Sequence, residues 1–167
     1  MKRRAIVGFG LLALLSLAVI GKPESSGLSK FDRSNSLLGP DVDHDGIRDD
    51  IDKYIEVIAA GKKYTPQQVM AMRQMARAYQ HLLAINVNDK DQLAEASEKY
   101  ERASSCIFFR FEEKDILYVS GKLQDHIFNT KKRIVAYENY INDNALYGSE
   151  DPDAELPPED ATSCDSK

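Results

Sequence analysis

Five aspartates follow a fixed spacing within twelve consecutive residues in the first third of the chain. Counted from the first, they occupy places 1, 3, 5, 9 and 12, and a glycine occupies place 6: Asp41, Asp43, Asp45, Asp49 and Asp52, with Gly46. Calcium-binding loops draw oxygen ligands from these places, add the backbone carbonyl of place 7, and need glycine for a sharp turn. The spacing therefore predicts a calcium site in which Ile47 supplies the carbonyl.

The charge of this segment gives an ion a physical role. Its carboxylates repel one another when the loop folds, and Arg48 alone cannot offset that repulsion. A divalent cation would turn the repulsion into binding energy, whereas a loop without one stays open or raises the pKa of some aspartates. The alternative is a solvated acidic turn that caps a helix. Magnesium is less suitable than calcium, because it rarely uses a cage built from protein ligands alone.

The loop resembles the calcium loops of thrombospondin type 3 repeats, dockerins and EF-hands. It departs from a complete EF-hand at place 8, which is usually aliphatic and is Arg48 here, and at place 12, where Asp52 replaces the usual glutamate. No helix enters the loop, because Pro40 directly precedes Asp41. His44, at place 4, is expected to point outward and is not counted as a ligand. A single loop argues against a paired calcium sensor and against a duplicated dockerin that binds a cohesin.

A wider resemblance concerns the order of several segments. They are an aspartate loop running into a helix, a helix rich in glutamine and alanine, a cysteine, an NTxxRxxAYxxY segment and a late Cys-Asp pair: Asp41 to Ile55, Gln67 to Gln80, Cys106, Asn129 to Tyr140, and Cys164 with Asp165. This order resembles a family of small exported proteins of Gram-negative bacteria. The resemblance implies export and calcium binding, and it implies no particular reaction.

The N-terminus has the features of a secretory signal. Lys2, Arg3 and Arg4 precede an uncharged, mostly apolar run from Ala5 to Ile20, which predicts a signal peptide over residues 1–21. The alternative is an uncleaved membrane anchor, although the run is short for a span. Cleavage would change the formal charge from −5 to about −8, because three basic residues are lost. Such an acidic protein is not expected to bind nucleic acid, which needs clustered basic residues, and no stable membrane span is expected after cleavage.

The chain has two cysteines, Cys106 and Cys164. An even count in an exported protein favours a disulfide, and this one would tether the C-terminal tail to the helices. Loop-closure entropy puts its stabilisation at roughly 4 kcal/mol. The alternative is two free or intermolecular thiols. The spacing of the pair fits neither a zinc site nor a redox CxxC centre.

Apolar residues recur at helical spacing along most of the remaining chain, which predicts an all-α bundle of about four to five helices. Before the loop we expect a flexible leader, residues 22–40, because this stretch is rich in Ser, Gly and Pro. The loop and helices form one domain, residues 41–147, and an irregular acidic tail follows, residues 148–167. The predicted helices span residues 49–60, 66–85, 89–106, 112–128 and 131–146, with 107–111 as a packed helix end rather than a strand.

Some details of these helices are specific enough to check. The clearest helix start is Thr65-Pro66 with Gln68, a capping box. Gly61 is expected to end the helix before it. The buried face of the last helix is predicted to be Ile134, Tyr137, Ile141 and Ala145.

No catalytic constellation accompanies the loop. The three histidines, His44, His81 and His126, lack the spacing of a zinc site, and no nucleophile or phosphate-loop motif occurs. The sequence therefore predicts a periplasmic or secreted calcium-binding protein with a structural or protein-interaction role, whose partner is another protein of the cell envelope. The alternative is an envelope hydrolase in which calcium is structural.

Overall fold

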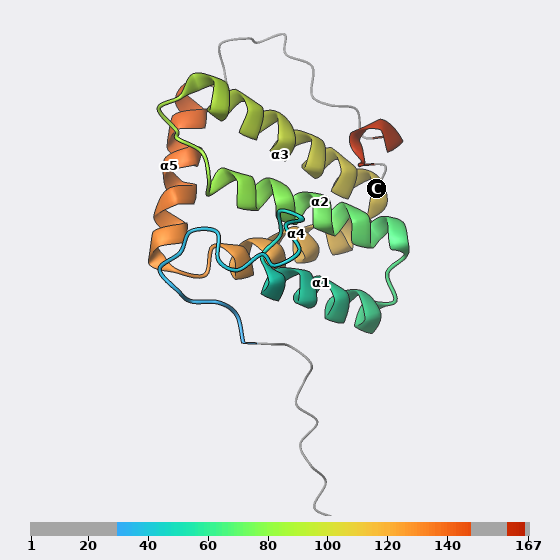
Figure 1. Ribbon diagram of the computed structural model, residues 1–167. Coiled ribbons are helices and arrows are strands. Elements are labelled where there is room, and N and C mark those ends of the chain that lie inside the picture. The colour runs from blue at the N-terminus through green and yellow to red at the C-terminus, as the bar shows by residue number, and fades with distance from the viewer. Residues whose placement is uncertain (1–29, 148–159, 166–167) are drawn as a thin grey trace, which may run out of the picture.

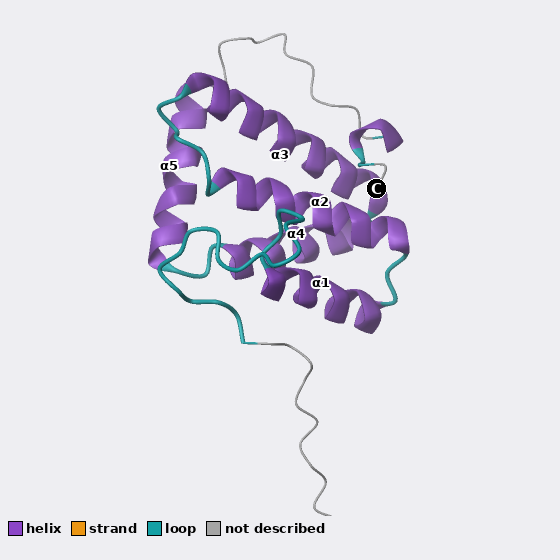
Figure 2. Ribbon diagram, viewed as in Figure 1, coloured by secondary structure: helices purple, strands orange, loops and turns teal. Residues whose placement is uncertain are grey.

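Helices form the secondary structure of residues 30–147 and 160–165, the part of the chain that the structure, a computed structural model, describes. These residues contain α-helices, one short 3-10 helix and no strand, which confirms the all-α fold (Figure 1, Figure 2). The elements are α1 Asp49–Lys62, α2 Pro66–Leu82, α3 Lys90–Arg110, α4 Glu113–Ile127, α5 Lys131–Tyr147 and η1 Ala161–Ser163. The predicted signal peptide, the start of the leader and most of the acidic tail fall outside the described residues. Within them, every helix is too short or too polar to cross a bilayer.

Helix α2 lies at the centre of the bundle and packs against α1, α3, α4 and α5. In Figure 1 it runs between α3 and α1. Its start is the predicted capping box, in which Thr65 Oγ1 accepts from the Gln68 amide at 3.3 Å and Gln68 Oε1 accepts from the Thr65 amide at 2.9 Å. Met72 and Ala76 are fully buried along it. The apolar face of α2 therefore organises the core, and its polar face is free to position other segments.

Two helix ends differ from the prediction. Helix α1 passes through Gly61, so the expectation that this glycine ends it was wrong. The left-handed residue is Lys63 instead (φ 58°), whose amide donates to the Ala60 carbonyl at 3.3 Å and closes the helix. Helix α2 ends at Leu82, three residues before the predicted end.

The last helix turns a different face inward than its apolar spacing predicts. Ile134 and Ile141 are each 43% exposed, so their predicted burial was wrong. Tyr137 does pack against the core, and the fourth predicted position lies beyond the described side chains. Among the described side chains of α5, the fully buried ones are Arg133 and Tyr140. A polar requirement thus sets the orientation of this helix, because the Arg133 guanidinium binds a distant segment.

That distant segment is the described part of the leader. Arg133 Nη2 forms an ion pair with Asp32 at 2.6 Å, and its Nε donates to the Leu37 carbonyl at 2.9 Å. The Phe31 ring stacks on His126 of α4, with ring centroids 4.0 Å apart. These contacts anchor residues 30–40 to α4 and α5, which the prediction of a flexible leader did not anticipate.

The C-terminal half of α3 is fixed covalently to the end of the described chain. The Sγ atoms of Cys106 and Cys164 lie 2.07 Å apart, which confirms the predicted pairing. Gln74 of α2 holds the same segment, because its amide group donates to the Ser163 carbonyl at 2.8 Å and accepts from the Asp165 amide at 2.9 Å. Helix α3 continues after its cysteine to residue 110, which confirms a helix rather than a strand. The predicted packing holds for Ile107 and Phe111, whereas Phe108 and Phe109 are exposed.

Candidate metal centre

The aspartate loop runs from Pro40 to Asp49, the first residue of α1. Its turns rest on two left-handed residues, His44 (φ 58°) and Gly46 (φ 85°). The second is the glycine that a calcium loop requires, because other side chains are strained at this φ. The loop closes where the Asp49 amide donates to the Pro40 carbonyl at 3.0 Å. Its two ends therefore meet at the N-terminus of α1, where the helix dipole favours negative charge.

Aspartate side chains tie the loop to its own backbone. The Gly46 amide donates to Asp41 Oδ2 at 3.0 Å, and the Val42 amide donates to Asp49 Oδ1 at 2.9 Å. Aspartate acceptors of this kind stabilise turns. They use one oxygen of each carboxylate and leave the other without a hydrogen bond to a described residue. The loop is therefore shaped in a way that keeps carboxylate oxygens available.

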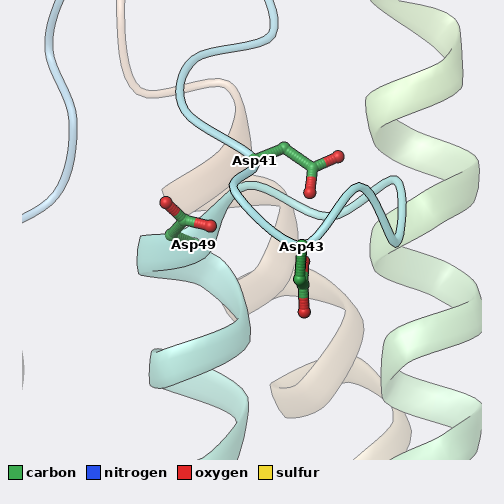
Figure 3. A group of neighbouring side chains, drawn as sticks. All are labelled: Asp41, Asp43 and Asp49. Atoms are coloured by element: carbon green, nitrogen blue, oxygen red, sulfur yellow. The ribbon is translucent and has the colours of Figure 1, made fainter.

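Three of the predicted ligands lie close together. Asp41 and Asp43 extend from the loop and Asp49 from the start of α1 (Figure 3), and one carboxylate oxygen of each lies within 4.8 Å of the other two. Oxygens at this spacing share a central point within about 2.8 Å of each, whereas calcium–oxygen distances are about 2.3–2.6 Å. A small inward movement of the side chains would bring all three within bonding distance of one ion.

Asp41 has an unsatisfied atom at this cluster. Its Oδ1 is buried and has no hydrogen-bond partner among the described residues. A buried carboxylate oxygen in that state is unfavourable, because it has lost its hydrogen bonds to water and has formed none with the protein. No described basic side chain forms an ion pair with Asp41, Asp43 or Asp49. The donor set is therefore acidic, oxygen-rich and short of a cation.

Asp45 and Ile47 hold the backbone of the loop. Asp45 Oδ1 accepts from the Ile47 amide at 2.8 Å, and this carboxylate is not part of the cluster of three. The Ile47 side chain is buried in the core together with Ile51. Core packing of the Ile47 side chain thus fixes the position of the residue whose backbone carbonyl is the predicted ligand. The assignment of Asp45 and the Ile47 carbonyl as ligands stays a prediction.

Asp52 is bound by an arginine of α2 instead of facing the cluster. Arg73 Nε and Nη2 lie 2.7 Å and 3.1 Å from its two carboxylate oxygens, in a forked arrangement. The hydrogen bond to Asp52 raises the pKa of Arg73. Asp52 would reach a metal ion at the cluster only by leaving Arg73.

Arg48, the unusual residue at place 8 of the loop, fastens the loop to α4. It is fully buried, its Nη2 donates to the His126 carbonyl at 2.8 Å, and its Nε pairs with Asp50 at 2.5 Å. The last carbonyls of a helix lack helical partners and carry partial negative charge, which suits a guanidinium. Burial lowers the pKa of Arg48 despite the Asp50 carboxylate. A β-carbon at Gly39 would collide with Arg48 Cδ, so this approach requires glycine. The sequence signal for this role was a charge at a usually aliphatic place.

The histidines take no part in the metal-binding group found among the described residues, which consists of the three aspartates alone. His44 lies in the loop, His81 on α2 and His126 on α4. Burial lowers the pKa of both His81 and His126. The lowered pKa favours the neutral ring in both; His126 packs against Phe31 and Tyr54, whereas His81 lies 3.4 Å from Lys99 Nζ.

No family model matches the chain, and no curated protein or solved structure matches it significantly. The case for a functional site therefore rests on the residues of the chain itself. They place an acidic, cation-deficient cluster at the N-terminus of the first helix of an all-α bundle.

Proposed function

We propose that the protein binds one calcium ion in the loop Asp41–Asp52 and that the ion fixes this loop on the bundle. The observation that carries the proposal is the cluster of Asp41, Asp43 and Asp49, whose carboxylates lie together without a basic partner among the described residues. Carboxylates so close repel one another, so a cation at their centre stabilises the folded loop. Oxygen ligands of this kind suit a hard cation such as calcium.

The cluster supplies part of a calcium coordination shell, which takes six to eight oxygens. Asp45 and the Ile47 carbonyl lie along the same loop and would supply further ligands, with water completing the shell. Asp52 would join them if it exchanged Arg73 for the ion. This ligand set favours calcium over magnesium, because magnesium demands a smaller and more regular arrangement.

A structural role for the ion follows from the connections of the loop. Ile47 enters the core, and Arg48 binds the end of α4. An ion that orders the loop would therefore also order the junction of the leader, α1 and α4. We propose that the protein works outside the cytoplasm, in the periplasm or secreted, where its surface contacts an envelope protein. The basic and apolar N-terminal run and the disulfide support this location, since disulfides persist in oxidising compartments.

The hydrolase alternative gains no support from the pocket beside the loop. Among its lining residues there is no serine, threonine or cysteine. A hydrolase that forms a covalent intermediate on one of these three residue types is therefore not supported at this pocket.

Calorimetric titration with calcium, combined with thermal unfolding, tests the proposal. We expect one calcium site per chain and a higher melting temperature in calcium than in chelator. At a free calcium concentration about a hundredfold above Kd, the added stability is about 2.7 kcal/mol. Magnesium at the same concentration should give a smaller increase.

A charge-matched pair of variants shows whether the loop is responsible. Asp43→Asn combined with Asp49→Asn removes two charges, yet the new amide oxygen still accepts from the Val42 amide, so the loop can keep its shape. This variant should show neither the heat of calcium binding nor the calcium-dependent rise in melting temperature. Glu98→Gln combined with Glu138→Gln, both exposed on other helices, should retain them. A wild-type melting temperature that responds to neither calcium nor chelator would contradict the proposal.

A further inference from the structure

A pocket of about 670 Å³ lies beside the loop. Its lining comes from the segment Leu38–Gly46, from α2 and α3, and from Asp165 near the end of the described chain. Leu38, Ala78 and Ala84 give it apolar surface. Binding sites for small molecules usually measure about 300–1,000 Å³ and combine apolar walls with a few polar groups. The pocket therefore has the size and character of a site for an organic molecule.

The walls formed by α2 and α3 are basic. They carry Arg77, Lys99 and Arg102. Arg77 is neutralised by Asp165 at 3.1 Å, and Lys99 pairs with Glu95 at 2.5 Å. Arg102 forms no ion pair with any described residue. An oxyanion in the pocket would gain the Arg102 guanidinium and share the Lys99 ammonium, and both would form charge-assisted hydrogen bonds.

A buried acceptor lies at the lining of the same pocket. Gln80 is only 5% exposed, and its Nε2 donates to the Leu38 carbonyl at 3.1 Å, which fixes the orientation of the amide. Its Oε1 is buried and has no donor among the described residues. Buried amide oxygens are nearly always hydrogen-bonded, so a donor is expected here. A ligand hydroxyl, or a water that accompanies the ligand, would supply this donor after a small movement of the amide, because the oxygen is enclosed by its neighbours.

We propose that this pocket binds a small hydroxylated organic anion of the sugar acid or sugar phosphate type. Lys99 and Arg102 hold the carboxylate or phosphate, Gln80 accepts from a hydroxyl or a bridging water, and the carbon skeleton lies against Ala78 and Ala84. The basic groups select against neutral sugars. The groups that make these contacts belong to α2, α3 and the turn after α2, and none of them is a predicted calcium ligand, although Asp41 of the loop lines the same pocket.

NMR titration of the isotope-labelled protein tests the inference, using galacturonate and glucose 6-phosphate as probes. Galactose and glucose serve as neutral comparators, in phosphate-free buffer, with calcium-loaded and calcium-free protein. We expect saturable amide shifts at Gln80, Ala84 and Lys99 with at least one of the two acids, and the stronger binder identifies the anionic group. The neutral sugars should bind at least about tenfold more weakly, since they lack the charge-assisted bonds.

Charge variants connect the binding to the basic wall. Lys99→Gln combined with Arg102→Gln changes two exposed residues, so the fold should persist, and far-UV circular dichroism checks this. The dissociation constant should rise at least about tenfold. Lys114→Gln combined with Lys122→Gln removes the same charge from α4 and should leave it unchanged. The inference is overturned if neither acid saturates at millimolar concentration in either calcium state, if neutral sugars bind equally well, or if both double variants behave alike. Calcium calorimetry reports separately on the loop.

Discussion

Two groups of aspartates in the N-terminal part of the described chain are balanced in different ways. We call them the paired aspartates, Asp32, Asp50 and Asp52, and the loop aspartates, Asp41, Asp43 and Asp49. Each paired aspartate forms an ion pair with an arginine side chain. No loop aspartate forms an ion pair with a described residue, although the three carboxylates lie together. The fold thus provides its own cations where a carboxylate joins two segments, whereas the loop aspartates have no such cation among the described residues, which is why we propose that one binds there from solution.

Removing an arginine from a paired aspartate should have the largest effect. Arg133→Met removes the guanidinium from the mostly buried Asp32 carboxylate, which keeps only the Ser34 amide and hydroxyl as described donors. It also leaves the Leu37 carbonyl without the donor that Arg133 provides. Breaking a buried pair in this way costs about 3–5 kcal/mol. Urea unfolding of the calcium-free protein measures the loss. Lys131→Met, at an exposed neighbouring position, should change the free energy of unfolding by less than about 0.5 kcal/mol. Equal losses of unfolding free energy in both variants would show that the ion pair of Arg133 and Asp32 does not stabilise the fold.

Acid pH should weaken the same pair. The hydrogen bond from Arg133 lowers the pKa of Asp32 from 3.8 to about 2. Because the folded pKa lies below the unfolded one, the ionised carboxylate stabilises the protein above about pH 4, and this stability is lost as the pH falls toward 2. Urea unfolding across this range should show a steeper decline for the wild type than for Asp32→Asn. Identical slopes would mean that the pair does not contribute to acid sensitivity.

The partly exposed pair of Arg73 and Asp52 should matter least to stability. Both side chains remain partly exposed, so Arg73→Gln should cost about 1 kcal/mol or less in chelator. In calcium the variant is more informative, because it releases Asp52 to turn toward the ion. Calcium should bind more tightly to Arg73→Gln than to Arg77→Gln, which removes the same charge near the loop without releasing Asp52. Equal calcium affinities of the two variants would show that Asp52 is not a calcium ligand even when Arg73 is absent.

The local spacing of apolar residues was enough to predict the helices, but it did not predict the buried face of every helix. The spacing of apolar residues indicated all five helices, and the capping box at Thr65 fixed the start of α2. The buried face of α5 was missed because Arg133 bonds with leader residues about a hundred positions away, which no local pattern reveals. The anchored leader was missed for the same reason. Interactions between segments that are distant in sequence were therefore what the sequence pattern could not predict.

The candidate site shows the same limit. The spacing of aspartates predicted ligands on one continuous loop, and the backbone turns of that loop do bring Asp41, Asp43 and Asp49 together, while their role as ligands stays a prediction. It could not indicate that Arg73 of α2 would bind Asp52. The pocket was also invisible, because its walls come from the loop, two helices and the last described residues. Sequence spacing predicts what one continuous segment does, and here the neighbouring segments decide the rest.

The bond between Cys106 and Cys164 has a mechanical consequence. It joins residues 58 positions apart, so α4 and α5 belong to a closed ring within the chain. Tension applied along the backbone would pass directly from α3 to the segment after the ring, and α4 and α5 would carry no load. Reduction would open the ring and add roughly 200 Å to the length over which the stretched chain can extend.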